Sequence, residues 1–406
     1  MRLLVYTDYR YRRRGGRVFG ERAFVRFLGA LAQQLGGLRL LGRLDHGDGA
    51  ARYELDAAIE FLALPDYPAL TELRALARAL PATLIAMWQA VGEADVVLSL
   101  GPQPPALMLA LIALARGRGL VLGVRQDFPS YVRHRHPRRP ALRLAAGALE
   151  ACWRALARRA PVIAVGPDLW ARYRHAPRLL EATISLVGEA DVRAGAAAPA
   201  ARDYAGAELV LLTVGRLEAE KNPLLLADVL ALLCAADPRW RLVVCGEGPM
   251  RQGLAARLEE LGVARWARLC GYLPLHEGLL ELYRTSHVFL HVSLTEGLPQ
   301  TLIEAYACGL PTVATAVGGV RSLGRCSLLV APGDAVAAAA AVRRLAEDER
   351  LRSQLIAAGL DHARAVTLES QAAAVAQFIA AAHGGSEGRL RASGDADATG
   401  GCPGGG

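Results

Sequence analysis

Short apolar runs alternate with helical segments along most of this chain, and the alternation begins twice. In the first half, we expect strands at 3–7, 38–41, 94–100, 119–124 and 161–165, and helices at 18–35 and 106–115. Strands that alternate with helices form parallel sheets covered on both faces, so this half predicts a doubly wound α/β domain. Ligands of such sheets bind beyond the carboxyl ends of the strands.

The pattern breaks in an Ala-rich segment at 190–207 and then restarts. We expect strands at 208–214, 240–245, 267–270, 288–291 and 311–314, and helices at 222–235, 249–261, 276–285, 300–307, 334–346 and 366–382. The predicted organisation is a first domain over 1–190, a linker over 191–207, a second doubly wound domain over 208–365, a helix over 366–383 and a disordered tail over 384–406.

Positive charge is concentrated in the first half. Residues 1–190 hold 27 Arg against 16 Asp and Glu, whereas residues 191–406 hold 20 Arg and Lys against 23 Asp and Glu. Clusters at 10–14 and 133–139 carry much of the excess. They suit an anionic partner, such as a phospholipid surface or a lipid-linked phosphate, although a solubilising surface is an equal alternative. Nucleic acid is disfavoured, because no aromatic residues interleave the arginines in a known module.

The remaining composition points to a cytoplasmic protein that could touch the inner face of a membrane. The longest apolar stretch, 104–115, is too short to span a bilayer. The seven cysteines are scattered without Cys-x-x-Cys pairs or metal-ligand spacing, which indicates reduced thiols. Contact with an anionic membrane would therefore be peripheral and would involve the basic first domain.

One cation stands out. Every cationic side chain of the chain is an arginine except Lys221, and the adjacent Asn222 is the only asparagine. Lys221 follows a predicted strand and the turn at Gly215, with Arg216 five residues before it. A guanidinium and an ammonium beside a helix start suit a diphosphate, whose charge rises as it leaves. A surface loop would explain most such pairs, but it would not explain why the one lysine stands here.

Two further segments follow predicted strands of the second domain. Gly246 and Gly248 permit close backbone approach to a nucleobase or ribose, although a plain turn has the same pattern. Glu296 lies before a turn, and Glu304 lies in the helix that follows. These carboxylates could accept hydrogen bonds from the hydroxyls of a sugar and of a ribose. An unpaired charge at Glu304 would be costly, because its helical neighbours are apolar.

The order of these segments resembles glycosyltransferase family 4. The residues that carry the resemblance are Gly-Arg-Leu-x3-Lys at 215–221, Gly-x-Gly-Pro at 246–249, Glu-x7-Glu at 296–304 and Ala-x-Gly-x-Pro-x-Val-Ala-x3-Gly-Gly at 307–319. The resemblance covers about 208–335. It implies the GT-B fold, with two Rossmann-like domains facing across a cleft and a last helix that crosses back onto the first domain. It also implies a nucleotide-sugar donor, no other cofactor, no obligatory metal, and retention at the anomeric carbon.

Carried over by position, the resemblance assigns roles to individual residues. Arg216 and Lys221 would bind the donor phosphates, Glu296 would contact the donor sugar, and Glu304 would contact the ribose; the first three are the predicted catalytic residues. The other predicted donor-binding residues are Gly15, Gly16, Gly215, Gly246, Glu247, Gly297, Leu298 and Thr301. Arg125 and Asp127 are the acceptor-side candidates, whereas His134 and His136 are more simply part of a basic loop.

The predicted reaction is sugar transfer to a glycan or lipid-linked acceptor, without a covalent carboxylate intermediate. A nucleotide-sugar epimerase on the same fold is one alternative, but it would need acid and base residues that the sequence does not identify. A degenerate scaffold that binds a nucleotide sugar without turnover is another. The motifs leave the sugar, the base and the acceptor open.

Overall fold

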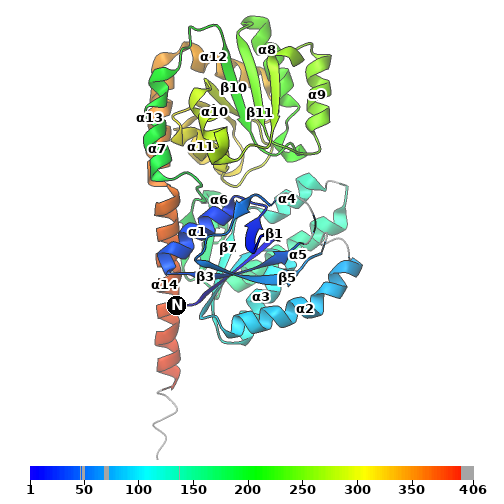
Figure 1. The fold of residues 1–406 in the computed structure, drawn as a ribbon, viewed down its shortest axis with the longest axis vertical. Helices are drawn as coiled ribbons and strands as arrows, with labels where there is room; N and C mark the ends of the chain where they lie inside the picture. Colours follow the sequence, from blue (N-terminus) through cyan, green and yellow to red (C-terminus); the bar gives the residue numbers. More distant parts are fainter. Residues whose placement is uncertain (46, 48–50, 68–72, 137, 395–406) are drawn as a thin grey trace, which may run out of the picture.

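The computed structural model describes residues 1–45, 47, 51–67, 73–136 and 138–394. Two α/β domains lie one above the other, and each contains a central sheet flanked by helices (Figure 1). This arrangement confirms the predicted pair of doubly wound domains.

The first domain is built on a sheet whose parallel strands run in the order β5-β3-β1-β6-β7-β8-β9. The strands are β1 (Leu3–Arg14), β2 (Arg17–Gly20), β3 (Leu38–Leu44), β4 (Tyr53–Glu54), β5 (Ile59–Pro65), β6 (Val96–Gly101), β7 (Gly119–Val124), β8 (Val162–Val165) and β9 (Leu179–Ala182). The helices are α1 (Phe24–Leu35), α2 (Leu73–Gly92), α3 (Pro104–Ala115), α4 (Phe128–Arg135), α5 (Pro140–Ala157) and α6 (Pro167–Arg172).

A β-hairpin near the amino terminus corrects the sequence prediction. β1 continues past 3–7 as far as Arg14, and β2 returns antiparallel to it, with Arg14 opposite Arg17. Gly15 and Gly16 form the turn, with φ angles of 53° and 79° that suit glycine in a two-residue hairpin. Helix α1 therefore begins at Phe24, because the residues expected to start it at 18–20 pair as a strand instead.

The second domain has a fully parallel sheet in the order β12-β11-β10-β13-β14-β15. The strands are β10 (Leu209–Val214), β11 (Trp240–Cys245), β12 (Ala267–Gly271), β13 (Val288–His291), β14 (Thr312–Thr315) and β15 (Ser327–Val330). The helices around it are α8 (Leu225–Ala236), α9 (Arg251–Glu260), α10 (Leu280–Thr285), α11 (Gln300–Ala307), α12 (Ala335–Glu347) and α13 (Glu349–Ala365). Short turns precede two of them: η2 (Ala219–Lys221) precedes α8, and η4 (Leu275–Leu279) precedes α10.

The segment predicted as a linker, 191–207, is folded onto the second domain. It contains part of α7 (Glu189–Gly195) and all of η1 (Ala198–Ala201), and Arg202 donates hydrogen bonds to the carbonyl oxygens of Cys308 and Gly309. A Cβ atom at Gly195 would lie 1.9 Å from the carbonyl oxygen of Ala307, so α7 packs closely on α11. This close packing explains the glycine at position 195.

The last helix returns to the first domain, as predicted. α14 (Leu368–Gly394) packs along α1 and reaches β7 and β9 (Figure 1). The Gln371 side chain accepts a hydrogen bond from the Thr183 backbone at 2.8 Å, and Arg178 donates to the Ala381 carbonyl at 2.5 Å. The helix extends to Gly394, so the part of the predicted disordered tail at 384–394 is helical, because extending an existing helix costs little. The rest of that tail, 395–406, lies outside the described residues.

Among the described residues, no single helix is long and apolar enough to cross a membrane. One pair, Glu349–Ala365 and Leu368–Gly384, meets the length and composition criteria together but bends by 41°.

Candidate donor site at the strand ends of the second domain

The loops at the carboxyl ends of β10 and β11 pack backbone against backbone. A Cβ atom at Gly246 would lie 1.7 Å from the carbonyl oxygen of Gly215, and one at Gly248 would lie 2.3 Å from that of Leu217. Any other residue at these two positions would force the loops apart. The glycines predicted to approach a nucleotide thus also bring the two loops together.

The loop after β10 holds Arg216 between two carboxylates. Its guanidinium donates to Glu218 at 2.6 Å and to Glu220 at 3.3 Å, and its side chain is 38% exposed. Burial alone would lower the pKa of Arg216, but these two carboxylates raise it above its ordinary value. Arg216 therefore faces the site as a charged group whose present partners are anionic, as a diphosphate would be.

Lys221 and Asn222 each have a specific structural reason to be where they are. Asn222 adopts φ 50° and ψ 48°, a left-handed conformation that asparagine tolerates better than most residues. This turn ends η2 and places the Lys221 ammonium in an ion pair with Glu296. The one asparagine of the chain thus forms the turn, and the one lysine pairs with Glu296, the residue predicted to contact the donor sugar.

The side chain of Glu296 is 10% exposed and has partners on two sides. The same oxygen that contacts Lys221 lies 3.0 Å from Nε2 of His291, which also lies 3.2 Å from the Ser293 hydroxyl. Burial alone would raise the pKa of Glu296, but the charge of Lys221 and the hydrogen bond from His291 hold it well below its ordinary value. Glu296 is therefore an anion that can accept hydrogen bonds from sugar hydroxyls.

Glu304 is buried in α11 without a cationic partner in the described structure. The Tyr283 hydroxyl donates to one of its oxygens at 2.8 Å and also lies 3.4 Å from the Thr301 carbonyl. Burial raises the pKa of Glu304 to about 7, although the Tyr283 hydrogen bond opposes this. Ionising Glu304 is therefore costly, as expected for a carboxyl on an apolar helix, and the group is about half protonated near pH 7.

The loops that carry Arg216 and Glu296 lie against the first domain. Helix α4 contacts η2, and Tyr131 of α4 acts electrostatically on Arg216. A Cβ atom at Gly297 would lie 3.1 Å from the Arg125 carbonyl oxygen, and one at Gly166 would lie 3.4 Å from the Leu298 Cβ. Arg216, Lys221 and Glu296 therefore lie where the strand ends of one domain meet those of the other, at the predicted position for a ligand.

The acceptor-side candidates lie at the same junction but have structural partners of their own. Arg125 donates to the Tyr9 hydroxyl, and its guanidinium lies 3.9 Å from the centre of the Phe24 ring. Asp127 caps α4 through the Ser130 amide and pairs with Arg172 at 2.6 Å. Burial alone would raise the pKa of Asp127, but the hydrogen bond from Arg172 lowers it. Pro137 and the side chains of His134 and Arg135 lie outside the described residues.

Three other residues predicted as donor contacts have structural roles of their own. Gly15 and Gly16 turn the β1–β2 hairpin. The Glu247 side chain is 55% exposed and pairs with Arg251 at 3.5 Å. Its backbone carbonyl accepts from Leu217 at 2.9 Å, so this residue also ties the two glycine loops together.

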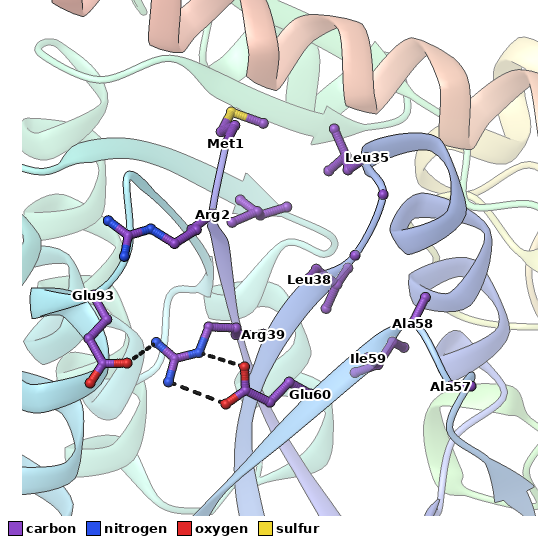
Figure 2. A pocket seen from close by; sticks show the side chains of 13 residues that line it. Met1, Arg2, Leu35, Leu38, Arg39, Ala57, Ala58, Ile59, Glu60 and Glu93 are labelled. Atoms are coloured by element: carbon purple, nitrogen blue, oxygen red, sulfur yellow. Dashed lines mark hydrogen bonds and ion pairs between the residues drawn. The ribbon is translucent and has the colours of Figure 1, made fainter.

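A large surface pocket lies elsewhere. It measures about 610 Å³ and is lined by the amino ends of β1, β3 and β5 (Figure 2). Its most prominent polar side chain, Arg39, is already paired with Glu60 at 3.1 Å and with Glu93 at 2.9 Å. Doubly wound sheets bind ligands at the opposite end, so this pocket is not the candidate site. Among the described residues, no three His, Cys, Asp or Glu side chains group so as to hold a metal ion.

Sequence reasoning missed His291 and Tyr283, which hold the two glutamates. The sequence predictions place His291 at the end of a strand and Tyr283 in the helix at 276–285, without a role in the site. A polar residue at the carboxyl end of a parallel strand was the available signal for His291, since ligands bind at that edge. Tyr283 gave no comparable signal.

Solved structures of other proteins share the fold of this chain. Sucrose-phosphate synthase from Thermosynechococcus elongatus matches 93% of this chain and 98% of its own, with a TM-score of 0.69 and 20% identity. Anabaena HepE, solved in complex with UDP-glucose, matches 97% of this chain and 100% of its own, with a TM-score of 0.60 and 18% identity. Two Rossmann-like domains joined by a returning helix define the GT-B fold, and this chain has it.

The sequence matches are confined to part of the chain. Residues 200–362 match the family described as Glycosyl transferases group 1. A D-inositol 3-phosphate glycosyltransferase of Thermomonospora curvata is 36% identical over 167 residues, which are 38% of this chain and 38% of that relative. The matched family region spans nearly the whole second domain, where the motifs of the predicted resemblance also lie.

Proposed function

We propose that this protein is a retaining glycosyltransferase that transfers a sugar from a nucleotide sugar to a glycan or lipid-linked acceptor. The observation that carries the proposal is the ion pair of Lys221 and Glu296 at the strand ends of the second domain, beside helix α4 of the first domain. The family match over residues 200–362, the GT-B fold and this charge arrangement support the same reaction.

In the proposed reaction, the donor diphosphate replaces carboxylates as the partner of the two cations. Arg216 exchanges Glu218 and Glu220 for phosphate oxygens, and Lys221 exchanges Glu296. Negative charge on the diphosphate grows as its bond to the sugar breaks. The cations therefore stabilise the transition state more than they stabilise the bound donor. Because His291 still holds Glu296, that carboxylate remains in position to accept sugar hydroxyls while Glu304 accepts those of the ribose.

The donor and acceptor need separate tests. HepE was solved with UDP-glucose, which makes UDP-sugars the first donors to try. The matched sequence region lies in the donor half, so the relatives give no guide to the acceptor. Location in the cytoplasm with peripheral membrane contact, and no nucleic-acid partner, remain predictions from composition.

A thermal-shift panel tests the donor site. The wild type, Lys221→Ala and Glu304→Ala are each titrated with UDP-, GDP-, ADP- and TDP-sugars. We expect one nucleotide series to stabilise the wild type and both variants to lose that shift, while Arg241→Ala, which removes a distant ion pair with Glu208, keeps it. Variants that respond like the wild type would show that the donor binds elsewhere.

Two further assays separate the proposal from its alternatives. Release of nucleoside diphosphate with an extract of glycans and lipids as acceptor pool supports transfer. Donor binding without any release would indicate a degenerate scaffold, whereas exchange of sugar carbon-bound hydrogen with solvent deuterium would indicate an epimerase.

A further inference from the structure

One helical layer of the first domain exposes many apolar side chains on its outer side. Helices α2, α3 and α5 cover one face of the sheet and share a single core with it. The exposed large apolar side chains of these three helices include Leu84, Ile85, Trp88, Leu111, Leu114 and Leu144. Ile85 is 59% exposed, Trp88 50% and Leu144 79%. We call the outer side of α2, α3 and α5 the apolar–arginine layer.

The opposite face of the same sheet is built differently. There, α1 buries its apolar side chains, among them Phe27, Leu28 and Leu31, and α14 packs along it. Figure 1 shows α14 beside α1 on one side of the domain, with α2, α3 and α5 on the other. The apolar side chains of the apolar–arginine layer thus stay exposed while their counterparts across the sheet are covered.

The charges of this layer are of one sign. In residues 73–92, 104–115 and 140–157, Glu150 is the only acidic residue, and it is buried and accepts a hydrogen bond from the Tyr173 hydroxyl at 2.9 Å. Arg78, Arg143 and Arg154 are exposed on α2 and α5. Just beyond these helices, Arg116 lies 4.7 Å from the centre of the Trp88 ring, whereas Glu93, directly after α2, pairs with Arg39 at 2.9 Å.

We propose that the apolar–arginine layer docks the protein on an anionic phospholipid surface. Tryptophan, leucine and isoleucine enter the boundary between headgroups and acyl chains, while arginines at the same level contact lipid phosphates. The absence of exposed acidic side chains from the three helix sequences is the complementarity that such a surface requires. A symmetric pairing of two copies through this layer would instead bring these arginines against each other.

The position of the layer relative to the candidate donor site gives the docking a use. Helix α5 packs on α4, and α4 contacts η2, which carries Lys221. A membrane against α5 would therefore lie near the junction of the two domains, where a lipid-linked acceptor could enter. This part of the inference rests on the proposed function, whereas the docking itself does not.

Vesicle co-sedimentation of the full chain tests the docking. Vesicles of phosphatidylcholine alone are compared with vesicles containing about 30% phosphatidylglycerol, at low and high salt. We compare the wild type with Ile85→Ser/Trp88→Ser and with Arg78→Gln/Arg143→Gln. The matched control is Leu232→Ser/Val336→Ser, which changes two exposed apolar residues of the second domain.

We expect the wild type and the control to bind anionic vesicles at least tenfold more tightly than neutral ones. Each double variant should lose roughly tenfold or more of that affinity, since one arginine near an anionic surface contributes about fivefold. Unchanged thermal stability and unchanged UDP binding would show that the variants fold and that the donor site is intact. The docking is overturned if the wild type does not bind anionic vesicles or if both layer variants bind them like the control. It is also overturned if light scattering shows a dimer that the Ile85→Ser/Trp88→Ser change dissociates. Failure of donor binding in the wild type would count against the proposed function and not against the docking.

Discussion

Replacing Glu304 with glutamine should make the folded protein more stable at alkaline pH. The carboxyl is 6% exposed, lies on an apolar helix and has a neutral partner, the Tyr283 hydroxyl. A glutamine side chain of almost the same size can accept the same hydrogen bond and never carries a charge. The substitution therefore isolates the cost of ionising this one group.

The size of the effect follows from the pKa of Glu304. Burial raises it from 4.5 to about 7, so between these values the folded protein keeps a proton that the unfolded chain releases. The stability of the wild type must then fall as pH rises through this window. Each tenfold change in proton affinity corresponds to about 1.4 kcal/mol, so the full loss is about 3 kcal/mol. It should be complete above pH 7 and absent below pH 4.5.

Urea unfolding from pH 4 to pH 9 measures this difference. The free energy of unfolding of Glu304→Gln minus that of the wild type should be near zero at the acid end and should rise to about 3 kcal/mol at the alkaline end. Glu247→Gln, which changes an exposed carboxylate of the same domain, is the matched control and should give a flat difference. A flat difference for Glu304→Gln as well would refute the account of Glu304 as a costly buried charge.

Three further outcomes follow from the same geometry. Lys221→Ala should lower kcat by about 100- to 1000-fold in a transfer assay, because it removes a cation from the leaving diphosphate. His291→Leu should lower kcat/KM by about tenfold or more, as expected for losing a hydrogen bond to a charged group. His291→Gln keeps a donor toward Glu296 and should recover most of the lost kcat/KM. Equal losses in both variants would refute this positioning role. Gly318→Ala should destabilise the protein by about 3 kcal/mol in urea unfolding, since its Cβ would lie 1.9 Å from the Glu296 carbonyl oxygen, whereas Gly333→Ala, in open space at φ 80°, should cost about 1 kcal/mol.

The fold of the second domain was largely predictable because its strands are continuous apolar runs. Trp240–Cys245, Val288–His291 and the helix Gln300–Ala307 end where the sequence placed them. The strand β15 and the helix α13 were not anticipated. In the first domain, Gly15 and Gly16 fit either a loop before a helix or a hairpin turn. The pairing of β2 with β1 and with β4 decides between the two.

The electrostatics of the candidate site were harder to predict than its position. Motif spacing predicts Arg216, Lys221 and Glu296 as donor-site residues, yet it gives no sign that each cation already has a carboxylate partner. Whether a loop carboxylate points to solvent or to an arginine depends on the backbone path, which spacing does not determine. The buried charge cost of Glu304 was foreseen because it needs only the apolar neighbours along one helix.

The central claim is that Arg216 and Lys221 receive the diphosphate of the donor. Isothermal titration calorimetry of a nucleoside diphosphate and the matching monophosphate, against the wild type and Lys221→Ala, tests it most directly. We expect the diphosphate to bind the wild type at least tenfold more tightly than the monophosphate, an advantage of about 1.4 kcal/mol or more. That advantage should vanish in Lys221→Ala, while monophosphate affinity stays the same. If the variant keeps the full preference for the diphosphate, the cations of this loop do not hold it.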